Sequence, residues 1–207
     1  MSVMNMKNKT DKTDKIIYDI VKRGLDIIMS IIMLVFAIPI IGITCIAVVL
    51  ESKGNPIYKQ ERLGKDGKEF NIYKIRSMVI DAEKDGAKWA VKNDSRVTKV
   101  GKFIRKTRVD ELPQLLNLLV GDMSLIGPRP ERRVFADEFS KTIPDFGRRL
   151  EVKPGLTGLA QVCGGYDLTP AEKLVYDIQY IETRSFLLDV KIFFKTIAVV
   201  ITGDGAR

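Results

Sequence analysis

The hydrophobic pattern divides the chain into one long apolar segment and a basic remainder. Residues 27–50 form an uncharged run with Pro39 at its middle. About 24 residues at a helical rise of about 1.5 Å each reach roughly 36 Å, enough to cross the hydrocarbon core of a bilayer. Apolar residues between Lys15 and Gly24 share one helical face and lead into this run. We therefore expect residues 15–50 to be embedded in a membrane.

Both flanks of the apolar run are basic. The positive residues near it are Lys7, Lys9, Lys12, Lys15, Lys22 and Arg23 before it, and Lys53, Lys59, Arg62 and Lys65 after it. A crossing helix carries more positive charge on its cytoplasmic side, whereas a re-entrant helix that enters and leaves by one face suits two basic flanks. Proline supplies a break because it lacks an amide hydrogen. We expect a re-entrant helix broken near Pro39; a kinked crossing and a buried soluble helix are the alternatives.

The remaining pattern predicts an α+β fold dominated by helix. Residues 1–14 are polar and aperiodic, which predicts a disordered tail, and residues 51–207 form one domain on one side of the membrane. Two strands flank an Asp-Gly turn, which is typical of a hairpin, and Thr169 to Glu172 has the form of a helix capping box. The expected strands cover residues 55–62 and 69–76, and the expected helices cover residues 80–90, 99–107, 110–120, 170–184 and 186–201.

Two of these helices have an amphipathic pattern that fits two environments. Residues 99–107 combine apolar positions with four cations, as in a helix lying among lipid headgroups or a basic helix packed on the domain. Residues 186–201 are strongly apolar but contain Asp189, Lys191 and Lys195. These charges argue against a second crossing, and the helix either packs on the domain or rests in the interface.

Composition narrows the chemistry. The net charge of +8 favours an anionic partner, either lipid headgroups or a phosphorylated substrate, and no segment resembles a nucleic-acid-binding module. The chain has no histidine, which excludes Ser-His and Cys-His nucleophile pairs and histidine-containing zinc sites. Cys45 and Cys163 are far apart in sequence and form neither a disulfide framework nor a metal motif. Any chemistry in this chain must therefore use carboxylates, lysines and arginines, with or without a bound hard cation.

Asp110 and Glu111 are the main candidates for chemistry. They stand at a predicted helix start, where a carboxylate accepts backbone amide hydrogens, and arginines flank them. Such a carboxylate serves as a nucleophile or as a ligand for Mg²⁺; a helix cap with surface ion pairs is the alternative. Arg129 lies between two prolines, which restrict its backbone as a preorganised anion clamp would need; a rigid turn with an incidental arginine is the alternative. Arg148, Arg149 and a glycine-bearing loop over residues 153–158 add groups that suit a diphosphate substrate.

Several long motifs occur in one order along residues 22–203. They are Lys22-Arg23-Gly24-Leu25-Asp26, the strand residues 73–78, residues 100–107, Asp110-Glu111-Leu112-Pro113-Gln114, residues 121–130 and residues 152–162. In these motifs the chain resembles the small monotopic phosphoglycosyl transferases, bacterial sugar transferases that begin the assembly of exopolysaccharides and glycoconjugates.

The resemblance implies transfer of a sugar phosphate from a UDP-sugar to a polyprenyl phosphate, usually undecaprenyl phosphate, with release of UMP. Asp110 would be the nucleophile that carries the phosphosugar covalently, and Glu111 would help to bind Mg²⁺ or take a proton. The implied phosphate or headgroup contacts are Arg105 and Arg129, followed by Lys74, Arg76, Arg148 and Arg149. The implied setting is the cytoplasmic face of the bacterial inner membrane, where residues 51–207 form the catalytic domain. Membrane lipid is then a partner, and a homodimer is compatible with this setting.

Two departures from the family pattern concern the membrane break and the substrate loop. The break reads Ile38-Pro39 where the family has Ser-Pro, and Cys163-Gly164-Gly165 stands where many relatives have Asn-Gly-Arg. The second change removes an amide and an arginine near the presumed nucleotide or sugar site. The rival hypothesis is a membrane-tethered scaffold that recruits partners through its basic face without catalysis.

Overall fold

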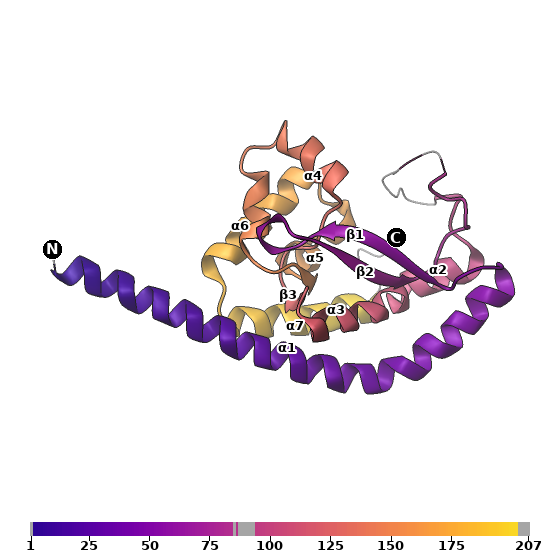
Figure 1. Ribbon diagram of the computed structural model, residues 1–207, viewed down its shortest axis with the longest axis horizontal. Helices are drawn as coiled ribbons and strands as arrows, with labels where there is room; N and C mark the ends of the chain where they lie inside the picture. The colour runs from indigo at the N-terminus through magenta and orange to yellow at the C-terminus, as the bar shows by residue number, and fades with distance from the viewer. Residues whose placement is uncertain (1, 85, 87–93, 203–207) are drawn as a thin grey trace.

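The computed structural model describes residues 2–84, 86 and 94–202. Its longest element is α1, which runs from Ser2 to Glu51 and contains Pro39. Figure 1 shows α1 as one bent helix, with the other elements lying along its concave side. The part from Lys15 to Glu51 is long and apolar enough to cross a membrane. Its outward apolar side chains include Phe36 and Ile43, which are 69% and 71% exposed. The bend near the middle fits the expected break, and re-entrant insertion stays a prediction.

The structure extends α1 through residues 2–14, where the sequence predicts a disordered tail. This segment contains neither proline nor glycine. No residue type in it therefore interrupts the backbone hydrogen bonds that continue from the apolar part of the helix.

The predicted hairpin is confirmed. β1 (Ile57–Leu63) pairs antiparallel with β2 (Glu69–Ile75), in a register that matches Ile57 with Ile75. The turn contains a short 3₁₀ segment, η1 (Lys65–Gly67), in which Asp66 and Gly67 have φ values of 57° and 74°. Asp and Gly are the residues that tolerate this left-handed backbone best, which is why the Asp-Gly pair marks the turn.

Most predicted helices are present. α2 covers Lys99–Lys106, α6 covers Pro170–Thr183 behind the expected capping box, and α7 covers Phe186–Thr202. The helix expected over residues 110–120 is divided into a 3₁₀ segment, η2 (Val109–Gln114), and a short α-helix, α3 (Leu115–Val120). Pro113 lies in η2, where it cannot donate an amide hydrogen to a regular helix.

The helix expected over residues 80–90 is wrong in its described part. Residues 80–84 form turns, and residues 85 and 87–93 lie outside the described residues. Long-range bonds hold this segment out of a helix: the Val79 amide donates to the Arg96 carbonyl over 3.0 Å, and the Arg96 guanidinium donates to the Ala82 carbonyl over 3.0 Å.

The sequence reasoning missed a small parallel sheet and several short helices. The missed elements are β3 (Ser124–Ile126), β4 (Gly155–Thr157), α4 (Arg133–Ser140), η3 (Phe146–Glu151), α5 (Leu159–Cys163) and η4 (Gly165–Asp167). β3 and β4 pair in parallel. Their glycines allow backbones to touch: a methyl group on Gly155 would lie 2.1 Å from the Gly127 nitrogen, and one on Gly158 would lie 2.1 Å from the Gly127 oxygen. These loop glycines therefore pack against Gly127.

Polar contacts of Arg23 and Asp26 fix α1 to the rest of the protein. Arg23 donates to the carbonyls of Leu118 and Leu119 at the end of α3, over 2.6 and 2.8 Å, and Asp26 accepts from the Leu125 amide of β3 over 2.9 Å. Ala37 of α1 joins Leu115 and Leu118 in a buried apolar cluster. α3 continues directly from η2, which contains Asp110 and Glu111. The contacts between α1 and α3 therefore also position these two residues.

Gly155→Ala should destabilise the fold by about 2–4 kcal/mol, because the added methyl group meets backbone atoms that cannot rotate away. Gly147→Ala is the matched control, since a methyl group there meets nothing within 4 Å. Thermal unfolding of both variants in detergent measures the difference. Equal melting temperatures for the two variants would show that the β3–β4 contact is not tight.

Candidate active site

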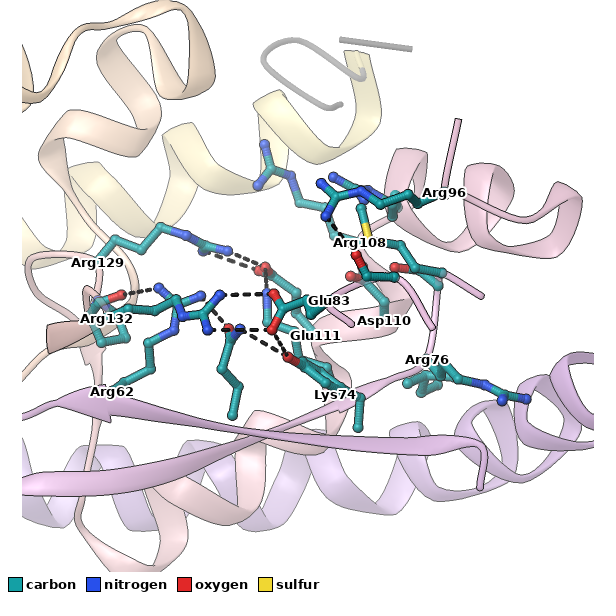
Figure 2. Close-up of a pocket in the computed structure, with 18 of the residues that line it drawn as sticks. Arg62, Lys74, Arg76, Glu83, Arg96, Arg108, Asp110, Glu111, Arg129 and Arg132 are labelled. Carbon is teal, nitrogen blue, oxygen red and sulfur yellow. Dashed lines mark hydrogen bonds and ion pairs between the residues drawn. The ribbon is translucent and has the colours of Figure 1, made fainter. Parts of the chain in front are cut away.

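A cavity of about 280 Å³ lies over one face of the hairpin. Its walls come from β1, β2, η2, the turns near Glu83 and the loop that contains Arg129 (Figure 2). The charged residues that line it are Arg62, Lys74, Arg76, Glu83, Arg96, Arg105, Arg108, Asp110, Glu111, Arg129, Glu131, Arg132 and Lys173. Cations therefore outnumber carboxylates on the wall, so the cavity suits an anionic ligand.

Local backbone geometry places the two adjacent acids. Arg108 has a φ of 56°, the left-handed region, directly before η2. The Glu111 amide donates to the Arg108 carbonyl over 3.1 Å, which closes the turn. A non-glycine residue in this region is strained, and such strain is often retained at functional sites. The tight turn brings both carboxylates to the cavity although they are consecutive in sequence.

Glu111 takes the direct ion pairs. Lys74 of β2 donates to its Oε1 over 2.9 Å, and Arg129 donates to both carboxylate oxygens, over 3.3 Å at Oε2. Burial favours the neutral form of Glu111, but the charges and hydrogen bonds of Arg129 and Lys74 outweigh it and hold its pKa well below the ordinary value. Glu111 is thus ionised and locked in place.

Asp110 stands in a different electrostatic environment. Its side chain is only 8% exposed. Burial, followed by the neighbouring charge of Glu111, raises the pKa of Asp110 to about 6, against the opposing influence of Lys74, Arg105 and Arg129. The carboxylate is therefore ionised at neutral pH but poorly solvated. A desolvated carboxylate beside cations can attack an electrophilic phosphorus whose oxygens those cations neutralise.

The structure brings together most of the site residues expected from the sequence. Asp110, Glu111, Lys74, Arg105 and Arg129 all line the cavity. These residues come from four segments of the chain, so the fold itself assembles them.

Arg76 also borders the cavity, but its guanidinium is directed elsewhere. It donates to the carbonyls of Ser52 and Lys53, just after α1, over 2.5 and 3.0 Å. Figure 2 shows its side chain pointing away from Asp110. Arg76 thus joins the end of the membrane helix to β2.

The two neighbouring arginines of η3 do not line this cavity. Arg148 is a surface residue that pairs with Glu151 and Glu182, each over 3.0 Å. Arg149 is buried and pairs with Asp177 of α6 over 2.7 Å. Arg149 lines two neighbouring cavities that Arg129 also lines. The expected role of both arginines as secondary phosphate or headgroup contacts stays a prediction.

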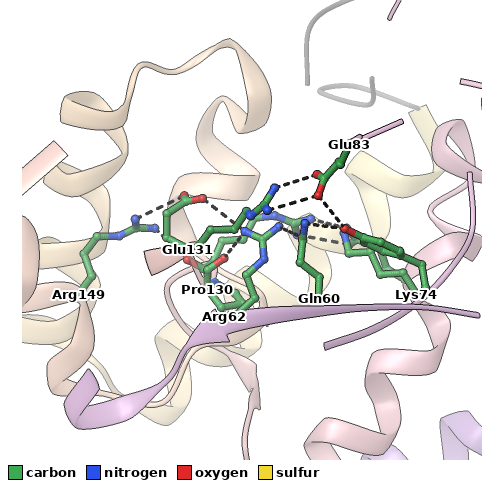
Figure 3. Close-up of polar contacts among 11 residues, drawn as sticks. Gln60, Arg62, Lys74, Glu83, Pro130, Glu131 and Arg149 are labelled. Atoms are coloured by element: carbon green, nitrogen blue, oxygen red, sulfur yellow. Dashed lines mark hydrogen bonds and ion pairs between the residues drawn. The ribbon is translucent and has the colours of Figure 1, made fainter. Parts of the chain in front are cut away.

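A second polar group, missed by the sequence reasoning, forms the outer wall of the cavity. Glu83 accepts hydrogen bonds from Arg132 over 2.8 Å and from Tyr58 over 3.3 Å (Figure 3). Gln60 donates to the Tyr58 hydroxyl over 3.0 Å and accepts from Arg62 over 2.5 Å. The strand period of two offered a signal, because residues 58, 60 and 62 share one face of β1.

The carboxylates of the cavity would bind a metal ion only together with oxygen atoms of a bound substrate. Among residues 2–84, 86 and 94–202 there is no group of three or more side chains of the metal-binding types. Both oxygens of Glu111 accept from cations, which leaves Asp110 as the more available carboxylate. Mg²⁺ is commonly held by one or two carboxylates together with substrate phosphates, so Asp110 fits such a mixed site.

Comparison with known proteins identifies the family and several relatives of this chain. The family model described as bacterial sugar transferase matches residues 17–203. The UDP-N-acetylgalactosamine-undecaprenyl-phosphate N-acetylgalactosaminephosphotransferase of Aeromonas hydrophila is 47% identical over 92% of this chain and 46% of its own length. The putative undecaprenyl-phosphate N-acetylgalactosaminyl 1-phosphate transferase of Bacillus subtilis is 57% identical over 64% of this chain and 74% of its own length.

A further relative carries a different sugar in its name. The UDP-glucose:undecaprenyl-phosphate glucose-1-phosphate transferase of Caulobacter vibrioides is 38% identical over 93% of this chain and 74% of its own length. The chain thus spans less than half of the Aeromonas protein and about three quarters of the other two. The family match covers most of the sequence, including every element that forms the cavity. The chain belongs to the bacterial sugar transferase family.

Proposed function

We propose that this chain transfers a sugar 1-phosphate from a UDP-sugar to undecaprenyl phosphate and releases UMP. The observation that carries the proposal is that two adjacent acids have different environments. Lys74 and Arg129 form ion pairs with Glu111, whereas Asp110 is buried and has a raised pKa. The names of the relatives supply the substrate class. The Aeromonas and Bacillus relatives both have N-acetylgalactosamine in their names, so UDP-N-acetylgalactosamine is the first donor to test.

In the first half-reaction an Asp110 carboxylate oxygen attacks the β-phosphorus of the donor. The new bond joins this oxygen to phosphorus, and the bond from the β-phosphorus to the bridging oxygen breaks. That oxygen leaves on the α-phosphate with the electron pair, as UMP. Arg105 and Arg129 neutralise phosphate oxygens in the transition state, a role suited to fixed cations in a partly dry cavity. No proton needs to move, because the leaving phosphate is stable as an anion.

In the second half-reaction an oxygen of undecaprenyl phosphate attacks the phosphorus of the aspartyl adduct. The bond from phosphorus to Asp110 breaks, the carboxylate is regenerated, and the product is a lipid-linked diphosphate sugar. The acid is restored after each cycle, so it acts as a catalyst. Glu111 keeps Lys74 and Arg129 oriented throughout, because its carboxylate remains ionised.

We also propose Mg²⁺ as the cofactor, held by Asp110 and by phosphate oxygens of the donor. It would neutralise charge on the diphosphate as UMP departs. Glu111 is the weaker candidate ligand, because its oxygens already accept from Lys74 and Arg129.

The membrane setting follows from the two substrates. UDP-sugars are water-soluble, and the acceptor phosphate lies at the membrane surface, so only the reaction centre must reach headgroup height. We propose that α1 enters and leaves the inner membrane from its cytoplasmic face. Basic flanks on both ends of the apolar run, together with the bend in Figure 1, support this placement.

Asp110→Asn should abolish UMP release from UDP-sugars by the detergent-solubilised protein, because an amide is not a competent nucleophile. The loss should exceed about 1,000-fold. Asp137→Asn, at an exposed position of α4, is the matched control and should retain activity. Turnover by Asp110→Asn at a rate near that of the control would remove Asp110 from the mechanism.

The pH dependence of the first half-reaction should show one acid limb. At donor concentrations far below saturation, the second-order rate constant for adduct formation should fall about tenfold per pH unit below pH 6, because protonation of Asp110 in the free protein removes the nucleophile. Glu111 should contribute no limb in this range, since its pKa is held low. Rapid-quench measurements between pH 4.5 and 8 test this, and a flat profile across pH 6 would contradict the assignment.

Asp110→Asn should also make the folded protein more stable at neutral pH. The folded-state pKa of Asp110 is raised from 3.8 to about 6, so ionisation above pH 6 costs folding free energy of about 1–3 kcal/mol. The advantage of the variant should be present above pH 6 and disappear as the pH falls to 4, where the wild-type carboxyl is protonated. Thermal unfolding from pH 4 to 8 measures it. A variant that is less stable than wild type at pH 7.5 would contradict the raised pKa.

A further inference from the structure

The loop that carries Arg129 has no regular secondary structure, yet its guanidinium must stay on Glu111. We define the Arg129 loop as residues 127–132. Four successive carbonyls of this loop each accept a hydrogen bond, and the donors come from three segments, β1, η3 and β4. The donors are the Gly155 amide to Pro128 (2.8 Å), the Arg149 guanidinium to Arg129 (3.0 Å), the Arg62 guanidinium to Pro130 (3.1 Å) and the Leu63 amide to Glu131 (2.9 Å). The backbone of residues 128–131 is therefore fixed by hydrogen bonds at each residue.

The bond to Arg129 itself comes from a buried side chain. Arg149 is 8% exposed, and its guanidinium donates both to α6 and to the Arg129 loop. Its Nε donates to Asp177 of α6 over 2.7 Å, and its Nη2 donates to the Arg129 carbonyl. Its Nη1 lies 3.9 Å from a carboxylate oxygen of Glu131, an ion pair that Figure 3 shows, and its guanidinium lies over the Phe146 ring at 5.0 Å. The guanidinium is thus held by α6, by the Arg129 loop and by the Phe146 ring.

We infer that the Asp177–Arg149 pair is a positioning device for Arg129. This inference rests on the proposed function, in which Arg129 neutralises phosphate oxygens. A buried ion pair recovers little net free energy, because both charges lose their hydration. A planar guanidinium, however, fixes two partners in one orientation. Asp177 orients Arg149, Arg149 holds the Arg129 backbone, and Arg129 then reaches Glu111.

The adjacent arginine provides a natural comparison. Arg148 donates to Glu182, which lies on the same helix as Asp177, but this pair is on the surface. Both pairs connect η3 to α6, and only the buried pair continues to the Arg129 loop. A variant of Glu182 therefore removes an ion pair between the same two elements without touching Arg129.

The kinetic experiment measures adduct formation with donor alone in Asp177→Asn and in the control Glu182→Gln. Asp177→Asn should slow the reaction by roughly tenfold to 100-fold, because small displacements of a transition-state cation are costly. Glu182→Gln should stay within about twofold, as expected for an exposed pair. Arg149→Lys keeps the positive charge beside Asp177 but lacks the planar guanidinium. It should therefore slow adduct formation as much as Asp177→Asn does.

A double-mutant cycle separates positioning from general loss of packing. In an Arg129→Met background, Asp177→Asn should slow the residual reaction by less than about twofold, because the residue through which it acts is gone. If Asp177→Asn causes the same loss with and without Arg129, the pair supports the fold as a whole and the inference is wrong. Full activity of Asp177→Asn would also overturn it.

A spectroscopic readout keeps the inference testable if the proposed function fails. The Nε–H signal of Arg129 in a ¹⁵N-labelled sample, assigned by Arg129→Lys, reports the order of its guanidinium. Asp177→Asn should shift or broaden this signal, and Glu182→Gln should leave it unchanged. An unchanged signal in Asp177→Asn would refute positioning. Absence of an adduct in the unaltered protein would instead refute the proposed function.

Discussion

The geometry of the candidate active site depends on the ion pairs that Lys74 and Arg129 make with Glu111. These pairs give one carboxylate of an adjacent pair a lowered pKa and leave the other with a raised one. Two neighbouring acids in the same cavity thereby acquire different properties. Glu111 organises cations, and Asp110 remains poorly solvated, as a nucleophile should be. The asymmetry comes from position, since the side chains differ by only one methylene group.

The same cavity is coupled to the membrane helix at both ends. Arg23 and Asp26 bind the segment from α3 to β3, and Arg76 holds the end of α1 against β2. Since η2 packs against β2 and continues directly into α3, the position of Asp110 is set relative to α1. The Arg129 loop is fixed from the opposite side by η3 and α6. The cavity is therefore held between α1 on one side and η3 with α6 on the other.

Local sequence signals predicted local structure well. The Asp-Gly turn indicated the hairpin and the capping box indicated α6. The Asp-Glu pair, chosen as a candidate for chemistry, lines the cavity. Contacts between distant segments left weaker signals. Nothing in two consecutive arginines tells that Arg149 is buried against Asp177 while Arg148 is exposed, because that depends on how η3 packs. The glycines at positions 155 and 158 indicated a close backbone approach, and the structure shows that both pack against Gly127. The local sequence did not identify this partner. The turns at residues 80–84 are set by bonds from Arg96, outside the local window.

The covalent role of Asp110 is the central claim, and peptide mapping tests it most directly. The protein is mixed with UDP-N-acetylgalactosamine without acceptor, quenched within milliseconds, digested and analysed by mass spectrometry. The account predicts that the peptide containing residues 110 and 111 gains the mass of one sugar phosphate, with fragmentation that places it on Asp110. An adduct on Glu111, or UMP release with no adduct on any peptide, would contradict the account.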